Sequence, residues 1–230
     1  MSLYGWVILL SFSGPLALSF DQKVHYYTYW KLVVISIVSV AIPFLVWDEF
    51  FTNISVWGFN PRYLFGIYLG HLPLEEVLFF LVVPYNCLFV HQVLKAYFPN
   101  ASLEKLAQFF AFIFIVAAIL CFAFYFDKYY TAAASGLTVC YLFLAMKYKL
   151  KWFPSFALTF IVCLVPFLIV NGILTGAVTD EPIVWYSEKH IIGPRIFTIP
   201  IEDLFYNFSM LFPMVAIFEF LLAKKELKSL

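Results

Sequence analysis

The stretch GHLPLEEVLFFLVVP, residues 70–84, places two adjacent carboxylates, Glu75 and Glu76, at the start of an apolar run. A second stretch, FTIPIEDLFYNFSMLFP at residues 197–213, does the same with Glu202 and Asp203. Moving a charge toward the centre of a bilayer costs roughly 2.5–3.5 kcal/mol on insertion scales, so acids in apolar segments are candidates for function. We expect the two pairs to face one another across one site.

Each pair could also serve only to start a helix. Proline is favoured at the first position of a helix, and acids in the first turn complement the positive end of the helix dipole. Two observations favour a functional role over this purely structural one. The pattern occurs twice, and neither pair has a basic neighbour at the usual helical spacing.

The composition indicates a polytopic membrane protein. Of 230 residues, 64% are hydrophobic and only 12% are charged, whereas soluble domains carry about 25% charge. The formal net charge is zero, so nothing suggests a nucleic-acid partner. Because lipid offers no hydrogen-bond partners for the backbone, we expect such long apolar runs to be helical. The predicted fold is all-α, with seven transmembrane helices near residues 3–20, 30–47, 73–95, 105–126, 129–147, 152–174 and 200–222.

The lysine and arginine residues divide unequally between the two sets of alternating loops. Ten lie in one set and only Arg62, Lys128, Lys189 and Arg195 lie in the other. The positive-inside rule then predicts a multi-pass protein of the cell membrane with its N-terminus outside and its C-terminus in the cytoplasm. The two long connections, 48–72 and 175–199, and both acidic pairs would lie toward the outer face.

The sequence also contains an internal repeat. IPFLVWDEFFT at residues 42–52 aligns with VPFLIVNGILT at residues 165–175, which matches Asp48 with Asn171. Ser13-Gly14 aligns with Ser135-Gly136, and the two acidic motifs align in the same order. We expect parallel repeats in a 3+1+3 arrangement: residues 1–100, a linker helix in residues 101–127, and residues 128–230. Parallel repeats bring both acidic pairs to the same depth on the same side.

Such a cluster suits acid–base chemistry. Adjacent helical residues point about 100° apart, so only one acid of each pair can face the centre. Four clustered acids titrate as a coupled group, and we expect at least one to be protonated near neutrality. A protonated carboxyl then lies beside a charged carboxylate, which provides a general acid next to a general base. We expect Glu75→Gln or Glu202→Gln to abolish activity with folding intact.

Other polar positions offer weaker signals. Arg195 either pairs with an acid or lies among lipid headgroups, and the four histidines look scattered and interfacial. No Glu-x-x-His or clustered histidine predicts a metal site, and no glycine-rich phosphate loop implies a nucleotide cofactor. Phenylalanine is either lipid-facing or lines a cavity suited to a flat polyene and a carbocation. The candidate supporting residues are Asp48, Asn171, Arg195, Tyr206 and Asn207, the last two lying one turn after the second acidic pair.

Three stretches resemble a known family. WDEFFT (47–52), VWGFNPRYLFGIYLGHLPLEEVLFF (56–80) and IPIEDLFYNF (199–208) are similar to the membrane-bound lycopene cyclases of the heterodimeric type, in their fused single-chain form. The resemblance implies a non-redox cyclisation of the linear ψ-ends of lycopene to β-ionone rings, without a cofactor. It implies catalytic roles for Glu75, Glu76, Glu202 and Asp203, with lycopene or a related carotenoid as substrate and other carotenoid enzymes as neighbours.

Two other functions stay open at this point. Small transporters of the SWEET type also use a 3+1+3 arrangement, and the four acids would then form a cation or proton site. A carotenoid-binding protein without chemistry would need the acids only as helix starts. The ring type, the number of ends cyclised and the substrate length are also open.

Overall fold

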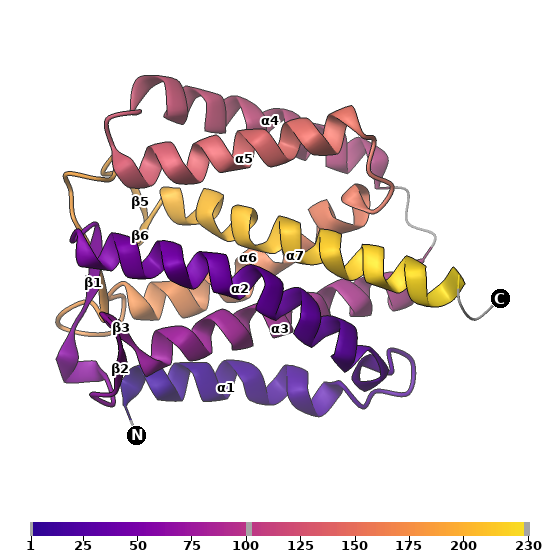
Figure 1. The fold of residues 1–230 in the computed structure, drawn as a ribbon, viewed down its shortest axis with the longest axis horizontal. Helices are drawn as coiled ribbons and strands as arrows, with labels where there is room; N and C mark the ends of the chain where they lie inside the picture. The colour runs from indigo at the N-terminus through magenta and orange to yellow at the C-terminus, as the bar shows by residue number, and fades with distance from the viewer. Residues whose placement is uncertain (1, 100–102, 228–230) are drawn as a thin grey trace.

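The structure is a computed structural model, which describes residues 2–99 and 103–227. The expected boundary of the first repeat, at residues 100 and 101, and Lys228 lie outside the described residues. Seven helices run roughly side by side (Figure 1). They are α1 (Leu3–Leu18), α2 (Trp30–Asn53), α3 (Leu74–Tyr97), α4 (Glu104–Phe124), α5 (Tyr129–Lys147), α6 (Phe153–Leu174) and α7 (Glu202–Leu227).

The prediction of an all-helical membrane protein with seven helices is confirmed for the described residues, and six helices, α2 to α7, are long and apolar enough to cross a membrane. The helix α1 has 16 residues, slightly fewer than the roughly 17–25 that a span needs. It ends where the Ser19 hydroxyl donates to the Pro15 carbonyl at 2.7 Å. The helix α2 continues to Asn53, beyond the predicted end at residue 47, and thereby keeps Asp48 inside a helix.

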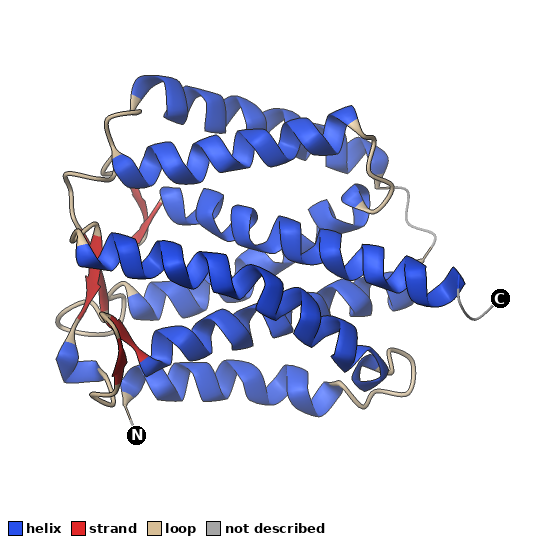
Figure 2. Cartoon of the chain, in the orientation of Figure 1, coloured by secondary structure: helices blue, strands red, loops and turns tan. Residues whose placement is uncertain are grey.

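The two long connections contain short strands that the sequence did not indicate. Figure 2 shows all of them at one end of the bundle, near the N-terminus. We call this the loop end. Two strands pair antiparallel across the molecule and the other four form two hairpins: β1 (Trp57–Phe59) with β4 (Val184–Tyr186), β2 (Tyr68–Leu69) with β3 (Leu72–Pro73), and β5 (Arg195–Ile196) with β6 (Ile199–Pro200). Each hairpin leads directly into the helix that carries an acidic pair, α3 or α7. Two short 3₁₀ helices, Tyr26–Tyr29 and Pro61–Tyr63, complete the described elements.

The helices pack in matching pairs. In the first predicted repeat α1 lies against α3, and in the second α5 lies against α7. Across the halves α2 packs on α7, and α6 packs on α3. The helix α4 packs on α5 and α6 at one side of the bundle (Figure 1). The central helices α3, α6 and α7 therefore meet, and the starts of α3 and α7 come together at the loop end.

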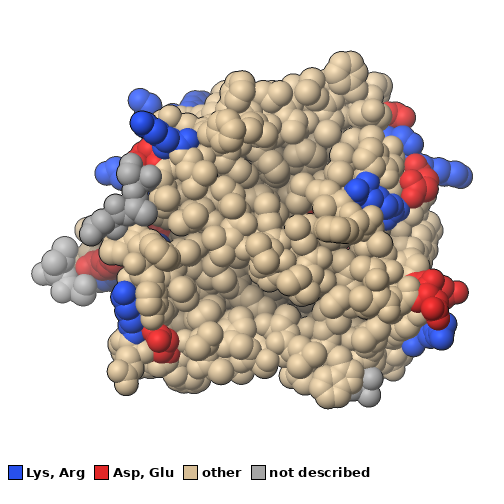
Figure 3. All heavy atoms as spheres, turned by 180° about the vertical axis from the view of Figure 1, so that it is seen from behind, with Lys and Arg blue, Asp and Glu red and all other residues tan. Residues whose placement is uncertain are grey.

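Charged side chains gather at the two ends of the molecule. Figure 3 shows Lys, Arg, Asp and Glu at the left and right edges and an almost uncharged face between them, with a hollow near its middle. Many large apolar side chains are exposed on this belt, including Phe109 and Phe112 of α4 and Val165 of α6. An apolar belt between charged ends is what a bilayer requires of a spanning bundle.

Candidate active site

A cavity lies at the loop end, between the helices and the β1–β4 pair. Its volume is about 70 Å³. Apolar lining comes from side chains such as Trp57, Phe59, Phe79 and Phe167. None of the described residues that line it is a lysine, arginine or histidine. The polar lining residues are Tyr4, Asp48, Glu76, Tyr130, Asn171, Thr175, Tyr186, Asp203, Tyr206 and Asn207.

The first acidic pair is divided between two environments. Glu76 lines the cavity, and the Tyr4 hydroxyl donates to its Oε2 at 2.6 Å. Glu75 is fully buried but is not among the lining residues. Its Oε1 accepts from the Ser2 hydroxyl at 2.7 Å and from the backbone N–H of Phe65 at 2.5 Å. The two carboxylates point different ways because neighbouring helical residues are about 100° apart.

The second pair is divided in the same way. Glu202 is fully buried, and its Oε1 accepts from the Thr131 hydroxyl at 2.7 Å and from the backbone N–H of Ile192 at 2.6 Å. Asp203 lines the cavity. We call Glu76 and Asp203, the members of the two pairs that line the cavity, the inner acids. Each accepts a hydrogen bond from a tyrosine at the second position of a helix, Tyr4 in α1 and Tyr130 in α5.

Asp203 has the largest set of donors. The Tyr130 hydroxyl donates to Oδ1 at 2.6 Å, and the Tyr186 hydroxyl and the Asn171 amide each donate to Oδ2 at 3.0 Å. Burial, and next the negative charge of Asp203, raise the pKa of Tyr186, which lies in β4 outside the helices. Its phenol therefore keeps its proton and stays a donor. Three donors on one carboxyl favour its charged form.

Asp48 is the third carboxylate of the cavity. The indole N–H of Trp57 donates to its Oδ1 at 2.6 Å, while its Oδ2 is buried and has no partner among the described residues. Asn171, which the sequence comparison matched with Asp48, instead uses its amide to hold Asp203. Asp48 and Asn171 therefore provide different chemistry, although the sequence comparison aligned them.

Tyr206 presents its ring to a cluster of aromatic side chains. Its centroid lies 5.1 Å from Trp47, 5.4 Å from Phe44, 5.9 Å from Tyr130 and 6.0 Å from Trp57. Its buried hydroxyl has no partner among the described residues. Neither Tyr206 nor Asn207 forms a described hydrogen bond with the acids, which the sequence had suggested, although both line the cavity. Much of the phenylalanine lies elsewhere, packed between helices or facing outward.

Arg195 pairs with an acid, which is one of the two alternatives that the sequence left open, but this acid is Glu188 and not a member of either acidic pair. Arg195 donates to Glu188 at 2.8 Å and to the Thr198 carbonyl at 2.9 Å. One histidine does not lie where the sequence suggested. His91 is not interfacial. It is fully buried, with Nδ1 2.8 Å from the Thr159 hydroxyl and Nε2 2.8 Å from Glu219.

Sequence reasoning missed the groups that orient the acids, namely Tyr4, Trp57, Tyr130 and Tyr186. In a chain with 15 tyrosines and 6 tryptophans none of them stands out. One signal was present: Tyr4 and Tyr130 both begin the first helix of a predicted repeat. Their partnership with the acids aligns the halves in a different register from the Ser13-Gly14 match, because short first helices constrain a sequence alignment poorly.

The fold and the cavity define a class of protein: a polytopic membrane protein with a buried, aromatic site that holds several carboxylates and no basic group among the lining residues. The chain belongs to the lycopene cyclase family, whose family model matches residues 1–94 and 127–221. These ranges contain α1, α2, α5 and α6 and most of α3 and α7, and they leave out α4. No curated protein and no solved structure matches the chain significantly. Membership in this family implies a carotenoid cyclase acting on lycopene, and so favours an enzyme over a transporter.

Proposed function

We propose that this protein is a lycopene β-cyclase that closes the ψ-ends of lycopene by proton-initiated, non-redox chemistry. The observation that carries the proposal is that Asp48, Glu76 and Asp203 face one aromatic cavity with no basic lining residue. Three negative charges in such a place repel one another, so they share protons. A proton held by a carboxyl in a dry site is what an alkene needs in order to become a cation.

The donors suggest which acid plays which part. Asp203, with three donors, is the carboxylate that accepts a proton. Glu76 and Asp48 each have one donor and are better suited to remain neutral acids. One of these two protonates the terminal double bond, the tertiary cation is attacked by the next double bond, and a six-membered ring closes. Asp203 then removes a proton from the ring, and the β-ionone double bond forms.

Glu75 and Glu202, the members of the two pairs that do not line the cavity, take a different role in this proposal. Each accepts one hydrogen bond from a hydroxyl near the start of α1 or α5 and another from a backbone N–H of a long connection. They are positioning residues that fix α3 and α7, and with them Glu76 and Asp203, against the loop end. This narrows the catalytic set expected from the sequence to the inner acids.

The aromatic rings supply the remaining requirement. A cation over the face of an aromatic ring within about 6 Å is stabilised by roughly 0.5–2 kcal/mol, most when water is excluded. Tyr206 and Trp57 line the cavity and contact each other. Pockets that bury drug-sized ligands hold about 300–1,000 Å³, far more than this cavity. The whole carotenoid does not fit in it, so in this proposal one end enters at a time and the cavity widens to take it.

The repeat and the orientation also belong to this proposal. Three observations support two parallel halves, residues 1–100 and 128–230, around a linker in 101–127. The second helix of each half packs on the third helix of the other, each half has a hairpin before its third helix, and one family model matches two ranges of the chain. The excess of lysine at the end opposite the strands supports a cytoplasmic C-terminus. The active site would then lie near the outer face of the membrane.

Expression in bacteria that accumulate red lycopene tests the function. We expect extracted pigment to shift from lycopene to orange carotenoids with β-ionone rings, identified by chromatography and mass spectrometry. Cyclisation leaves the mass unchanged, so an isomer of lycopene is the predicted product. Unchanged lycopene alongside abundant membrane-inserted protein would refute the proposal, and a different ring type would refute its β-specificity.

A pair of tyrosines in the same cavity separates hydrogen bonding from ring contact. Tyr186→Phe removes one donor from Asp203, and a hydrogen bond to a charged group contributes about 1.5–3 kcal/mol. We expect the cyclisation rate to fall by roughly tenfold or more. Tyr206→Phe makes the same chemical change where the hydroxyl has no described partner, so we expect a much smaller effect, whereas Tyr206→Leu, which removes the ring, should slow the reaction. Equal losses in the two Phe variants, measured as initial rates with purified protein, would contradict these roles.

A further inference from the structure

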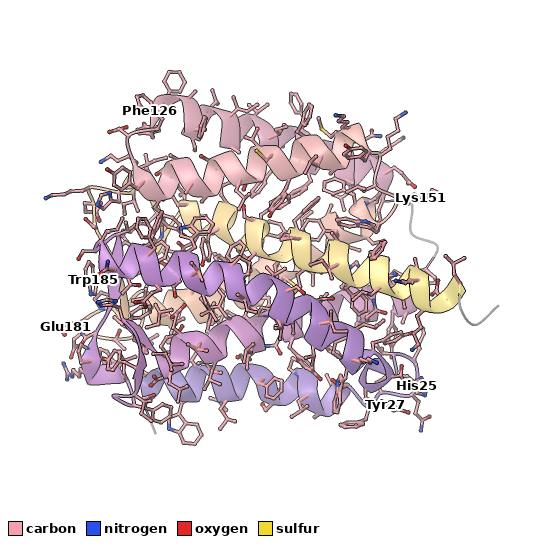
Figure 4. The ribbon with its side chains drawn as sticks, viewed as in Figure 1. His25, Tyr27, Phe126, Lys151, Glu181 and Trp185 are labelled. Carbon is pink, nitrogen blue, oxygen red and sulfur yellow. The ribbon has the colours of Figure 1, made fainter. Side chains whose placement is uncertain are left out.

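The β1–β4 pair forms the outer wall of the active-site cavity. Trp57 pairs with Tyr186 and Phe59 pairs with Val184, and all four side chains line the cavity. These short strands have three residues each. Figure 4 shows Trp185, the residue between Val184 and Tyr186, at this end of the bundle.

A second hollow lies on the other side of this wall. It has a volume of about 330 Å³. It is bordered by Trp185, Arg195 and Phe197, and the Phe197 side chain is 86% exposed. The hollow therefore opens to the surface at the loop end, where charged side chains also gather (Figure 3). Water has access to it.

Three residues border both spaces, so the wall is one side chain thick. They are Thr175, Val184 and Tyr186. Tyr186 is held by Asp203 at 3.0 Å. The Thr175 hydroxyl lies 2.7 Å from the hydroxyl of Thr198, which borders only the outer hollow. Val184 forms no side-chain hydrogen bond and contributes only apolar bulk.

We propose that this wall decides the product of the reaction by keeping water from the carbocation, and the inference rests on the proposed cyclase function. The tertiary cation formed by protonation has two fates. Attack by the neighbouring double bond closes the ring, and loss of a proton to a carboxylate completes it. Attack by water forms a carbon–oxygen bond, loses a proton to a carboxylate, and leaves a linear tertiary alcohol. The second fate adds one water and transfers no electrons.

Val184 is the position at which the wall can be opened with least disturbance. Its backbone pairing with Phe59 does not depend on the side chain, and its side chain does not bind an acid. In Val184→Ala the apolar barrier between the two spaces is thinner, and water reaches the cation. The variant acquires a hydratase activity that makes a monohydroxylated linear carotenoid from lycopene.

The experiment compares pigments made from lycopene by purified wild-type protein and variants in detergent or lipid. We expect the ratio of alcohol to cyclic product in Val184→Ala to rise at least about tenfold over wild type, which corresponds to a loss of about 1.4 kcal/mol in the preference for ring closure. Thr198→Ala, which opens the other side of the wall without touching the cavity lining, should shift the ratio in the same direction by less. Product made in water enriched in heavy oxygen should carry the label in the alcohol.

Ile183→Val is the matched control. Ile183 directly precedes Val184, is fully buried and packs with Tyr4 and Leu174 rather than against either space. It loses a methyl group from the same segment, and its product ratio should equal that of wild type. Cyclic product without alcohol from Val184→Ala, or the same alcohol fraction from Ile183→Val, would overturn the inference. If the cyclase function itself is wrong, wild-type protein makes no ring at all, so the two failures are distinguishable.

Discussion

Asp203→Asn is expected to lower the rate of cyclisation by roughly 10²- to 10⁴-fold, the range that a positioned acid or base contributes. The amide keeps the size of the carboxyl and an oxygen for the Tyr130 hydroxyl, so the fold should survive. It cannot take up a proton from the ring. One of the variants Glu76→Gln and Asp48→Asn should have an effect of the same order, because one of these two acids that line the cavity gives the proton to the double bond.

The adjacent acids provide the matched controls. Glu202→Gln and Glu75→Gln keep an oxygen that can accept from the same hydroxyl and backbone amide. Because neither carboxyl lines the cavity, we expect losses well below those of Asp203→Asn, which differs from the expectation drawn from the sequence. Initial rates at equal amounts of folded protein give the comparison. Full activity in Asp203→Asn, or a larger loss in Glu202→Gln, would reverse the assignment of the two positions.

Glu219→Ala is expected to have the largest effect on stability without altering the type of product. In the structure Glu219 Oε1 accepts from Lys95 at 2.6 Å and lies 2.8 Å from Nε2 of the fully buried His91. This network joins α3 to α7 at the end away from the acids, and His91 extends it to Thr159 of α6. Three of the helices that line the cavity, α3, α6 and α7, are thus joined at the end away from it.

Removing one partner of a buried charged pair typically costs about 3–5 kcal/mol, because the other is left without compensation. Since the Lys95 side chain is 33% exposed, we expect a loss near the lower limit, about 3 kcal/mol. Unfolding of purified protein in mixed micelles measures the change. The exposed residue Asp180 gives the control Asp180→Ala. Equal stability of the two variants, or a changed product ratio in Glu219→Ala, would contradict a purely structural role.

The sequence predicted the helices well because apolar length is a direct physical requirement of the bilayer. Predicted and observed bounds differ mostly by a few residues, and the larger departure, at the end of α2, involves polar residues. Asp48 stays helical and buried because Trp57, nine residues later, folds back to donate to it. No apolar pattern indicates such a contact.

The acids were recognisable, but their different environments were not. Two adjacent carboxylates look alike in a sequence, and only the path of the long connections decides which one is covered by a backbone amide. Phe65 and Ile192 provide those amides. The strands that shape the connections are two or three residues long, too short for the alternation that identifies a strand. For the same reason the wall at Val184 and the donors Tyr186 and Trp57 could not be predicted.

The central claim is that carboxyls in one dry cavity give a proton to a hydrocarbon and take another back. Conversion of lycopene by purified protein in heavy water tests it most directly, with product analysed by mass spectrometry. We predict one deuterium for every ring closed, bound to the carbon that was protonated, and no other change in mass. Rings that form without deuterium, with the protein fully exchanged beforehand, would contradict the claim.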